Sequence, residues 1–120
     1  MADKREKGVY GEELALEYLE QKGYLLIARN YRIGRDEIDL ILRDGELTVF
    51  VEVKARSSTK YGLACEAVDK RKQSRMVRAA LGFLQNQPEE TNVRFDVAEV
   101  DLNTGAVRHI ENAFMADAQY

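Results

Sequence analysis

The sequence has one cysteine, one histidine, one proline and no tryptophan among 120 residues. The single cysteine, Cys65, excludes an internal disulfide bond and a zinc site built from cysteines. It favours a reducing compartment, and we expect the cytoplasm. His109 has no second histidine with which to share a metal ion, so we expect it to be structural or solvent-exposed. No stretch approaches the roughly 20 apolar residues of a membrane-spanning helix, and no apolar run follows the charged N-terminus as in a signal peptide.

Charge is nearly balanced overall but unevenly distributed. The net charge is −3, yet residues 54–78 contain 8 basic and 2 acidic side chains, so that this segment is +6 and the remainder −9. A positive segment can attract phosphates even when the whole protein is acidic. The alternative is a solvated, lysine- and arginine-rich helix face. The length predicts a single domain over residues 1–120, large enough to bury about two thirds of its surface without disulfides.

Residues 36–54, DEIDLILRDGELTVFVEVK, predict a β-hairpin. Two runs of aliphatic and β-branched residues flank Asp44-Gly45, a dipeptide suited to a type I′ turn. If these are the two loop residues, Arg43 pairs with Glu46. Because side chains alternate between faces, this register places seven apolar residues on one face: Ile38, Leu40, Leu42, Leu47, Val49, Val51 and Val53.

The other face of this hairpin contains Asp39, Glu52 and Lys54. The predicted register places Asp39 opposite Phe50 and diagonal to Glu52, at roughly 7–8 Å, so that two carboxylates can hold one ion. The alternative is a set of solvated or ion-paired residues on an open face, worth about 0–1 kcal/mol per pair. The neighbouring Ile41 and Phe50 favour a covered surface, on which the acids need compensating charge.

A helix is predicted over residues 11–22, with Gly23 as its C-terminal stop. Its apolar arc consists of Leu14, Ala15, Leu16, Tyr18 and Leu19. Glu12 falls inside this arc instead of joining the other glutamates on the opposite side. It is either an acid that stabilises the helix N-terminus or a third carboxylate directed at the sheet.

The remaining elements are a strand over residues 24–31, a loop over 55–67 that is a candidate substrate flap, and strands over 93–102 and 106–111. A second helix begins near Asp69 as N-cap and ends near Gln85. Its residues expected to pack on the sheet are Met76, Val77, Ala80, Leu81 and Leu84. The order α-β-β-β-α-β-β predicts an α/β fold with a mixed central sheet flanked by helices.

Asp39 and then Glu52-Val53-Lys54 on the next strand, between a helix with Glu12 and a basic helix, resemble the PD-(D/E)xK core of restriction-endonuclease-like proteins. The chain resembles the bacterial YraN family more closely, which is itself similar to archaeal Holliday junction resolvases. The matching blocks, within about residues 8–100, are Gly11-Glu12, Gly23-Tyr24, Asn30-Tyr31, Glu37 to Ile41, Phe50 to Lys54, Ala67-Val68 with Lys72, and Arg94 to Val97. Ile38 stands in place of the proline of the motif, and Asp36 stands where glycine is more usual.

This resemblance implies a three-layer fold and a Mg²⁺ or Mn²⁺ ion held by Asp39, Glu52 and the carbonyl of Val53. Lys54 would orient the attacking water or stabilise charge on the phosphate. Glu12 would hold a metal-bound water or a second ion. Nucleic-acid contacts are expected from four residues on or after the second hairpin strand, namely Arg56, Arg71, Lys72 and Arg75.

The implied activity is metal-dependent hydrolysis of DNA, with branched or damaged structures as the substrates that the likeness to resolvases implies, by a symmetric homodimer. The alternative is a catalytically inactive module of the same fold that binds nucleic acid or a protein partner. The presence of Glu12, Asp39, Glu52 and Lys54 together favours an enzyme, whereas the acidic net charge favours the module. Whether the protein is an enzyme stays open at this point.

Overall fold

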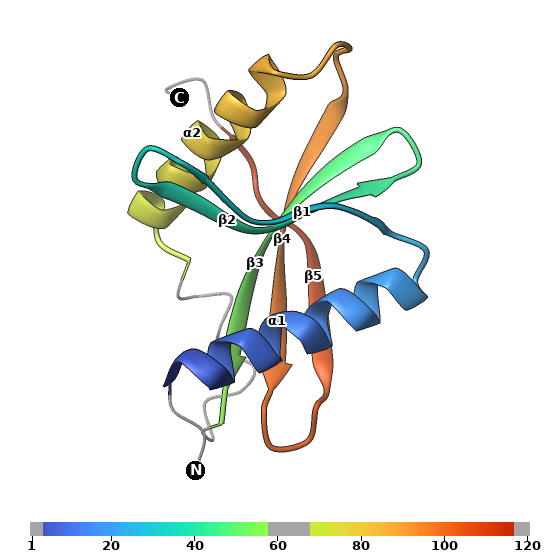
Figure 1. The fold of residues 1–120 in the computed structure, drawn as a ribbon, viewed down its shortest axis with the longest axis vertical. Helices are drawn as coiled ribbons and strands as arrows, with labels where there is room; N and C mark the ends of the chain where they lie inside the picture. Colours follow the sequence, from blue (N-terminus) through green and yellow to red (C-terminus); the bar gives the residue numbers. More distant parts are fainter. Residues whose placement is uncertain (1–3, 58–67, 117–120) are drawn as a thin grey trace.

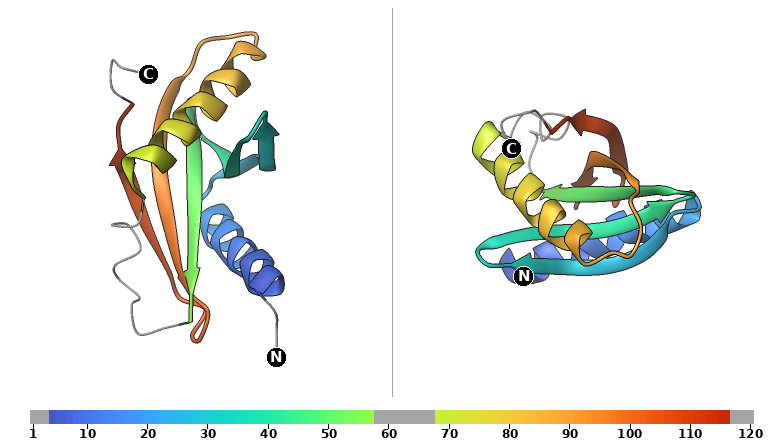
Figure 2. Two further views of the ribbon diagram at one scale, coloured as in Figure 1. Left: turned by 90° about the vertical axis from the view of Figure 1, so that its left-hand side faces the viewer. Right: turned by 90° about the horizontal axis from the view of Figure 1, so that it is seen from above.

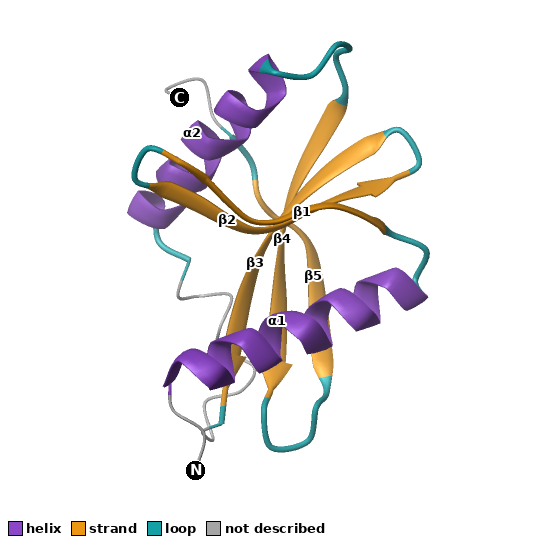
Figure 3. Cartoon of the chain, in the orientation of Figure 1, coloured by secondary structure: helices purple, strands orange, loops and turns teal. Residues whose placement is uncertain are grey.

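The computed structural model describes residues 4–57 and 68–116. Two helices and five strands follow one another in the predicted order (Figures 1 and 3). Their bounds are α1 Lys4–Gln21, β1 Leu25–Ile33, β2 Asp36–Asp44, β3 Leu47–Arg56, α2 Lys70–Gln85, β4 Asn92–Asp101 and β5 Val107–Phe114. Within these described ranges, no helix is long and apolar enough to cross a membrane.

The five strands form one sheet in which each strand lies beside the next one in the chain. β3 and β4 are parallel, and the other neighbouring pairs are antiparallel. A parallel pair needs a long crossover, and α2 lies within the connection from β3 to β4. The predicted α/β class with a mixed sheet is therefore confirmed.

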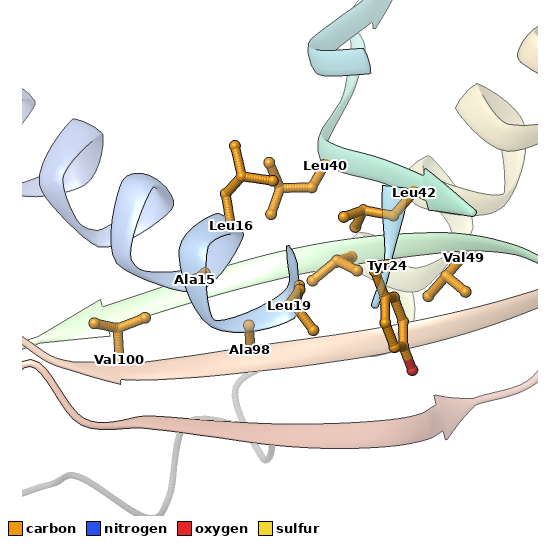
Figure 4. Packing of buried hydrophobic residues seen from close by; sticks show 10 residues of the cluster. Ala15, Leu16, Leu19, Tyr24, Leu40, Leu42, Val49, Ala98 and Val100 are labelled. Atoms are coloured by element: carbon orange, nitrogen blue, oxygen red, sulfur yellow. The ribbon is translucent and has the colours of Figure 1, made fainter. Parts of the chain in front are cut away.

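The two helices cover opposite faces of the sheet, which gives the expected three layers (Figure 2). Because side chains alternate along β3, Val49 and Val51 pack with α1, whereas Phe50 between them packs with α2. Figure 4 shows the α1 side of the core, where the labelled side chains are Ala15, Leu16, Leu19, Tyr24, Leu40, Leu42, Val49, Ala98 and Val100.

α2 begins and ends where the sequence predicts. The carboxylate of Asp69 caps the helix by accepting a hydrogen bond of 2.9 Å from the backbone N–H of Lys72. The prediction that Leu81 packs on the sheet is wrong, because this side chain is 44% exposed. Relative to the predicted orientation, the helix is rotated about its axis so that the face with Ala79 and Ala80 meets the sheet. Its buried residues are Met76, Val77, Ala79, Ala80 and Phe83.

α1 begins at Lys4, earlier than the predicted start at residue 11. Gly8 and Gly11 lower the helix propensity of this stretch. Packing compensates at Gly11, where a Cβ atom would lie only 2.5 Å from the Cβ of Ala55 in β3. Glycine thus lets the helix backbone approach the strand closely, and tertiary packing overrides local propensity.

The β2–β3 hairpin has the predicted faces but not the predicted register. Arg43 pairs with Thr48 instead of Glu46, a shift of two residues. The loop residues are Gly45 and Glu46, because Gly45 takes the positive φ angle of 61° at the first loop position. A shift of two residues leaves every side chain on its original face, so the apolar pattern could not detect it.

Ile38 is the exception to the predicted faces. It packs in the cluster under α2, whereas Leu40 packs under α1. The pairing of β2 with β3 ends at Leu40 and Val51, while β2 continues its pairing with β1 as far as Asp36. Two-stranded ribbons twist more strongly than wide sheets, and this twist turns Ile38 toward α2.

A buried carboxylate, Asp96, joins β4 to β5. Arg94 donates two hydrogen bonds of 2.8 Å to it, and His109 Nε2 lies 2.6 Å from its Oδ2 atom. The backbone N–H of Asn112, at an irregularity in the pairing, donates a fourth contact at 3.0 Å. Burial raises the pKa of Asp96. The hydrogen bonds from His109, Arg94 and Asn112 outweigh this effect and hold the pKa below its ordinary value. Of the two roles predicted for His109, the structure shows the structural one.

Candidate functional site

The candidate site lies where β2 separates from β3. Continuing the observed register beyond Leu40 and Val51 places Asp39 directly across from Glu52, not diagonal to it as predicted. In place of a ladder hydrogen bond, the backbone N–H of Val53 donates to Asp39 Oδ2 at 2.8 Å. The gap between the strands is thus bridged by a carboxylate, which is held at the edge of β3.

One open pocket of about 390 Å³ brings together all five residues of the predicted catalytic and metal sets. β2 and β3 supply Asp39, Glu52, Val53 and Lys54, and α1 supplies Glu12. Of the two roles considered for Glu12, the location at this pocket supports a carboxylate directed at the sheet. The pocket is lined by Lys7, Gly8, Glu12, Asp39, Glu52, Val53, Lys54, Ala55, Ser57 and Leu102.

Glu52 is the most buried acid of the pocket, with 4% of its surface exposed. Its Oε1 atom lies 3.3 Å from Lys72 Nζ and 3.6 Å from Lys54 Nζ. Its Oε2 atom is also buried and has no hydrogen-bond partner among the described residues. Two ammonium groups therefore balance the charge of Glu52 while one of its oxygens remains available to a further ligand.

Burial and the nearby charge of Glu52 raise the pKa of Asp39 from 3.8 to about 7. The hydrogen bond from Val53 and the charge of Lys72 oppose this rise. Burial, followed by the charge of Asp39, also raises the pKa of Glu12. The charge of Glu52 therefore disfavours ionisation of Asp39, and the charge of Asp39 disfavours ionisation of Glu12, which is the electrostatic condition that a bound cation relieves.

The donor set fits a hard divalent cation, which prefers oxygen ligands. The unpaired Glu52 Oε2 and the raised pKa of Asp39 both indicate carboxylate oxygens with too little positive charge in their surroundings. Among residues 4–57 and 68–116, no three His, Cys, Asp or Glu side chains lie close enough to hold a metal together. The expected set needs only two carboxylates, Asp39 and Glu52, with the main-chain carbonyl of Val53.

The four residues predicted to contact nucleic acid occupy different positions. Lys72 lies inside the site, where it pairs with Glu52, a location that sequence reasoning did not foresee. Arg71 and Arg75 are exposed on α2, and Arg56 is half-buried at the end of β3. All four lie on the segment from the end of β3 through the first half of α2.

Asp36, the residue at a position where glycine is more usual, has a partner in the structure. Its carboxylate accepts two hydrogen bonds of 3.3 Å from Arg78, which ties β2 to α2. Ala55 and Arg56 continue β3 instead of opening the predicted loop. Ser57 follows the strand, and residues 58–67 of the candidate flap lie outside the described residues.

Sequence reasoning missed two residues of this region. Lys7 lines the pocket because α1 extends beyond its predicted start. Asn30 lies across from Asp39 in the pairing of β1 with β2. A signal for Lys7 exists in the spacing of Gly8 and Gly11, which permits a helix to pack closely, whereas no local pattern distinguishes Asn30.

A larger pocket, of about 570 Å³, lies beside the β2–β3 turn. Its lining consists of polar residues from the turn and from the segment before β4, namely Arg43, Glu46, Glu89, Glu90, Thr91 and Asn92. The smaller pocket is the better candidate, because its carboxylates and ammonium groups converge from α1, β2 and β3.

Comparison with known proteins shows the family of this chain. The model of "Uncharacterised protein family UPF0102" matches residues 11–100. A UPF0102 protein of Halorhodospira halophila is 48% identical over 116 residues, covering 97% of this chain and 93% of the relative. A UPF0102 protein of Clostridioides difficile is 40% identical over 111 residues, which cover 92% of this chain and 97% of the relative.

A solved structure, that of Pyrococcus furiosus SfsA in complex with Ca²⁺, matches with 17% identity and a TM-score of 0.33. The match covers 91% of this chain and 64% of that chain, and a likeness at this level supports no conclusion about the site. The relatives from H. halophila and C. difficile match over nearly their whole length. The chain therefore belongs to the UPF0102 family, in agreement with its resemblance to YraN proteins.

Proposed function

We propose that this protein is a divalent-metal-dependent endonuclease that hydrolyses phosphodiester bonds in DNA. The observation that supports this most strongly is the convergence of Asp39, Glu52 and Lys54 with Glu12 at one pocket. Acidic ligands for a cation beside an ammonium group for a phosphate are what metal-assisted phosphodiester hydrolysis requires. Mg²⁺ or Mn²⁺ is the proposed cofactor.

In this proposal, Asp39, Glu52 and the carbonyl of Val53 hold the cation. A cation held there would supply polarisation of the scissile phosphate and a lowered pKa for a water molecule. Lys54 lies on the same face of β3 as Glu52 and stabilises negative charge that develops on the phosphate. Lys72 places a positive charge 3.3 Å from Glu52 Oε1, which offsets part of the negative charge gathered at the pocket.

The basic first half of α2 is the proposed DNA contact. Arg71 and Arg75 are exposed, and Lys72 between them connects this surface to the pocket. Contacts to the phosphate backbone set affinity and salt dependence without reading sequence. Branched DNA is the proposed substrate class, and a symmetric homodimer would match the two equivalent strands of a four-way junction.

A second candidate is an inactive module of the same fold that binds nucleic acid or a protein partner. One observation favours it: both ammonium groups near Glu52 already balance its charge, without a third acidic or imidazole ligand close enough among the described residues. DNA binding that is independent of divalent metal, together with no cleavage of single-stranded, duplex or branched DNA, would support this candidate.

Calorimetric titration of Mg²⁺ and Mn²⁺ into the protein tests the proposal, with and without an uncleavable branched DNA. Wild type is compared with Asp39→Asn and with Asp36→Asn, a control on the same strand whose carboxylate pairs with Arg78. We expect Asp39→Asn to abolish metal binding and Asp36→Asn to retain it. Absence of binding in wild type, or equal binding by all three proteins, would overturn the metal-dependent mechanism.

A further inference from the structure

Another pocket adjoins the candidate site where α1 passes the ends of β3 and β4 (Figure 1). Its volume of about 540 Å³ lies within the range of roughly 300–1,000 Å³ that is typical of small-ligand sites. Its lining residues are Glu6, Lys7, Tyr10, Ser57, Leu102 and Asn103. Three of these, Lys7, Ser57 and Leu102, also line the candidate site. A polymer bound at the candidate site can therefore place a neighbouring unit in this adjoining pocket.

Tyr10 is the one aromatic residue that lines the adjoining pocket. The other described tyrosines, Tyr18, Tyr24 and Tyr31, each contact a ring or an ammonium group. Tyr10 is 50% exposed, and no hydrogen bond or ring contact joins it to any part of residues 4–57 and 68–116. Half of its surface is thus available to a planar ligand, and nucleobases stack on tyrosine rings of this kind.

The turn between β4 and β5 holds Asn103 in place. The backbone N–H of Asn103 donates to Asp101 Oδ1 at 2.9 Å, and its side-chain amide donates to the carbonyl of Ser57 at 2.8 Å. The backbone N–H of Leu102 donates to the carbonyl of Arg56 at 2.8 Å, which ties the turn to the end of β3. The amide of Asn103 keeps a second N–H and its oxygen for a ligand, and the edge of a base presents a matching acceptor and donor.

The charges at the two pockets separate a phosphate from a base. Lys7 lines both pockets, so its ammonium group joins that of Lys54 near a phosphate in the candidate site. Glu6 lines the adjoining pocket but not the candidate site, and its charge disfavours a phosphate there. Glu6 and Lys7 both neighbour Tyr10 on α1, because residues three and four apart share a helix face. This arrangement suits a nucleotide whose uncharged base lies beside Tyr10.

We propose that the adjoining pocket binds the unpaired base of a nucleotide next to the phosphate that the candidate site cleaves. This inference rests on the proposed function and specifies its substrate, which is DNA with an unpaired nucleotide at the cleavage position, as at a flap or a branch point. Bases inside a duplex are stacked on one another, so an intact helix offers no base to Tyr10. Because every base can stack, the pocket selects DNA by its structure and not by its sequence.

Fluorescence anisotropy in the presence of Mn²⁺ tests this with uncleavable DNAs of equal length. The DNAs are an intact duplex, a duplex with a single-stranded flap, and the same flap with one base near the junction removed at a time. We expect wild type to bind the complete flap about 5- to 100-fold more tightly than the duplex. Removal of one particular base should abolish this gain. Tyr10→Phe keeps the ring and should match wild type.

Tyr10→Ala is the informative variant. It should weaken binding to the complete flap by the factor that removal of the base costs, and it should not weaken binding to the flap that already lacks this base. Val9→Ala is the matched control, because Val9 precedes Tyr10 on α1, is similarly exposed and does not line the adjoining pocket. Thermal unfolding establishes that each variant is folded before the titrations.

The outcomes separate this inference from the proposed function. If wild type binds flap and duplex equally, or if no single base matters, the role of the adjoining pocket is overturned while the proposed metal site stands. Loss of the same factor by Tyr10→Ala with and without the base overturns it as well. If wild type binds none of these DNAs, the proposed action on DNA is overturned, and the inference with it.

Discussion

The backbone N–H of Val53 donates a hydrogen bond of 2.8 Å to the Oδ2 atom of Asp39. This contact replaces the strand pairing that ends one residue earlier, at Leu40 and Val51. It satisfies a main-chain donor that would otherwise be left unpaired at the strand edge. The same contact fixes the carboxylate of Asp39 beside Glu52. The candidate site therefore forms where the pairing of β2 with β3 ends.

The stability of the protein is expected to fall with rising pH because of Asp39. Its pKa is about 7 in the folded state and near 3.8 in the unfolded chain, so the folded state binds more protons between these values. The contribution of protonated Asp39 to folding stability is therefore fully present below about pH 4 and is lost as pH rises through about 7. Asp39→Asn keeps an acceptor for Val53 and should gain stability relative to wild type across this range. Urea unfolding at several pH values measures the difference, and a difference that stays constant with pH contradicts the prediction.

Substitution of two glycines of α1 by alanine should have opposite effects. At Gly11 a Cβ would meet the Cβ of Ala55 at 2.5 Å, so Gly11→Ala forces α1 away from β3 and is expected to cost about 1–3 kcal/mol. At Gly8 a Cβ would have no neighbour within 4 Å, so Gly8→Ala should stabilise the helix by about 0.5–1 kcal/mol. Chemical denaturation measures both. Equal effects of the two substitutions would argue against the close packing of α1 on β3.

Asp96 is expected to be the most sensitive acidic position for folding. Asp96→Ala removes the carboxylate that Arg94 and the buried His109 share, and loss of one partner from a buried charged network costs about 3–5 kcal/mol. Asp101→Ala is a suitable control, because the carboxylate of Asp101 accepts a local hydrogen bond from the backbone N–H of Asn103, two residues away. The free energy of unfolding in urea should separate the two variants clearly.

The pH dependence at Asp96 has the opposite sign to that at Asp39. Hydrogen bonds hold its folded-state pKa below the ordinary value of 3.8, although burial alone would raise it. Its contribution to stability is therefore present above about pH 4 and is lost as pH falls through the folded-state pKa. We expect the difference in stability between wild type and Asp96→Asn to shrink in this acidic range. A difference that grows toward low pH would refute the assignment of Asp96 as an ionised acceptor.

DNA binding should depend on the exposed arginines of α2. If Arg71 and Arg75 each contact a phosphate, replacing either by alanine weakens binding and reduces the slope of log K against log salt by about 0.9. Arg43→Ala removes an exposed arginine beside the β2–β3 turn and should change neither quantity. Fluorescence anisotropy with a labelled branched DNA over a range of salt concentrations provides both values. Equal losses for all three variants would indicate that binding depends on net charge alone.

The predicted faces of the hairpin were correct because alternation is a local property of a strand. The register was wrong by two residues, since a slip of two preserves alternation and only the φ angle of Gly45 decides between the two turns. Ile38 was placed on the wrong face for a different reason. Its direction depends on where β2 leaves β3, which no pattern within the strand encodes.

The candidate site was predictable residue by residue but not as an arrangement. Asp39, Glu52 and Lys54 could be placed on one face of the hairpin from the sequence. The role of Glu12 depended on whether α1 packs against this part of the sheet, and Lys72 was expected at the DNA surface although it lies 3.3 Å from Glu52. Both contacts join elements that are distant in the chain, so their formation depends on packing of the whole fold.

The sequence by itself determined the order of the elements, the two faces of the central hairpin and the N-terminus of α2 at Asp69, because each follows from local periodicity or capping. Only the tertiary structure decided that Glu12, Asp39 and Glu52 share a pocket with Lys54. The physical reason is that these contacts depend on the close approach of α1 to β3 at Gly11 and on the separation of β2 from β3. Both features result from long-range packing of the helices on a twisted sheet.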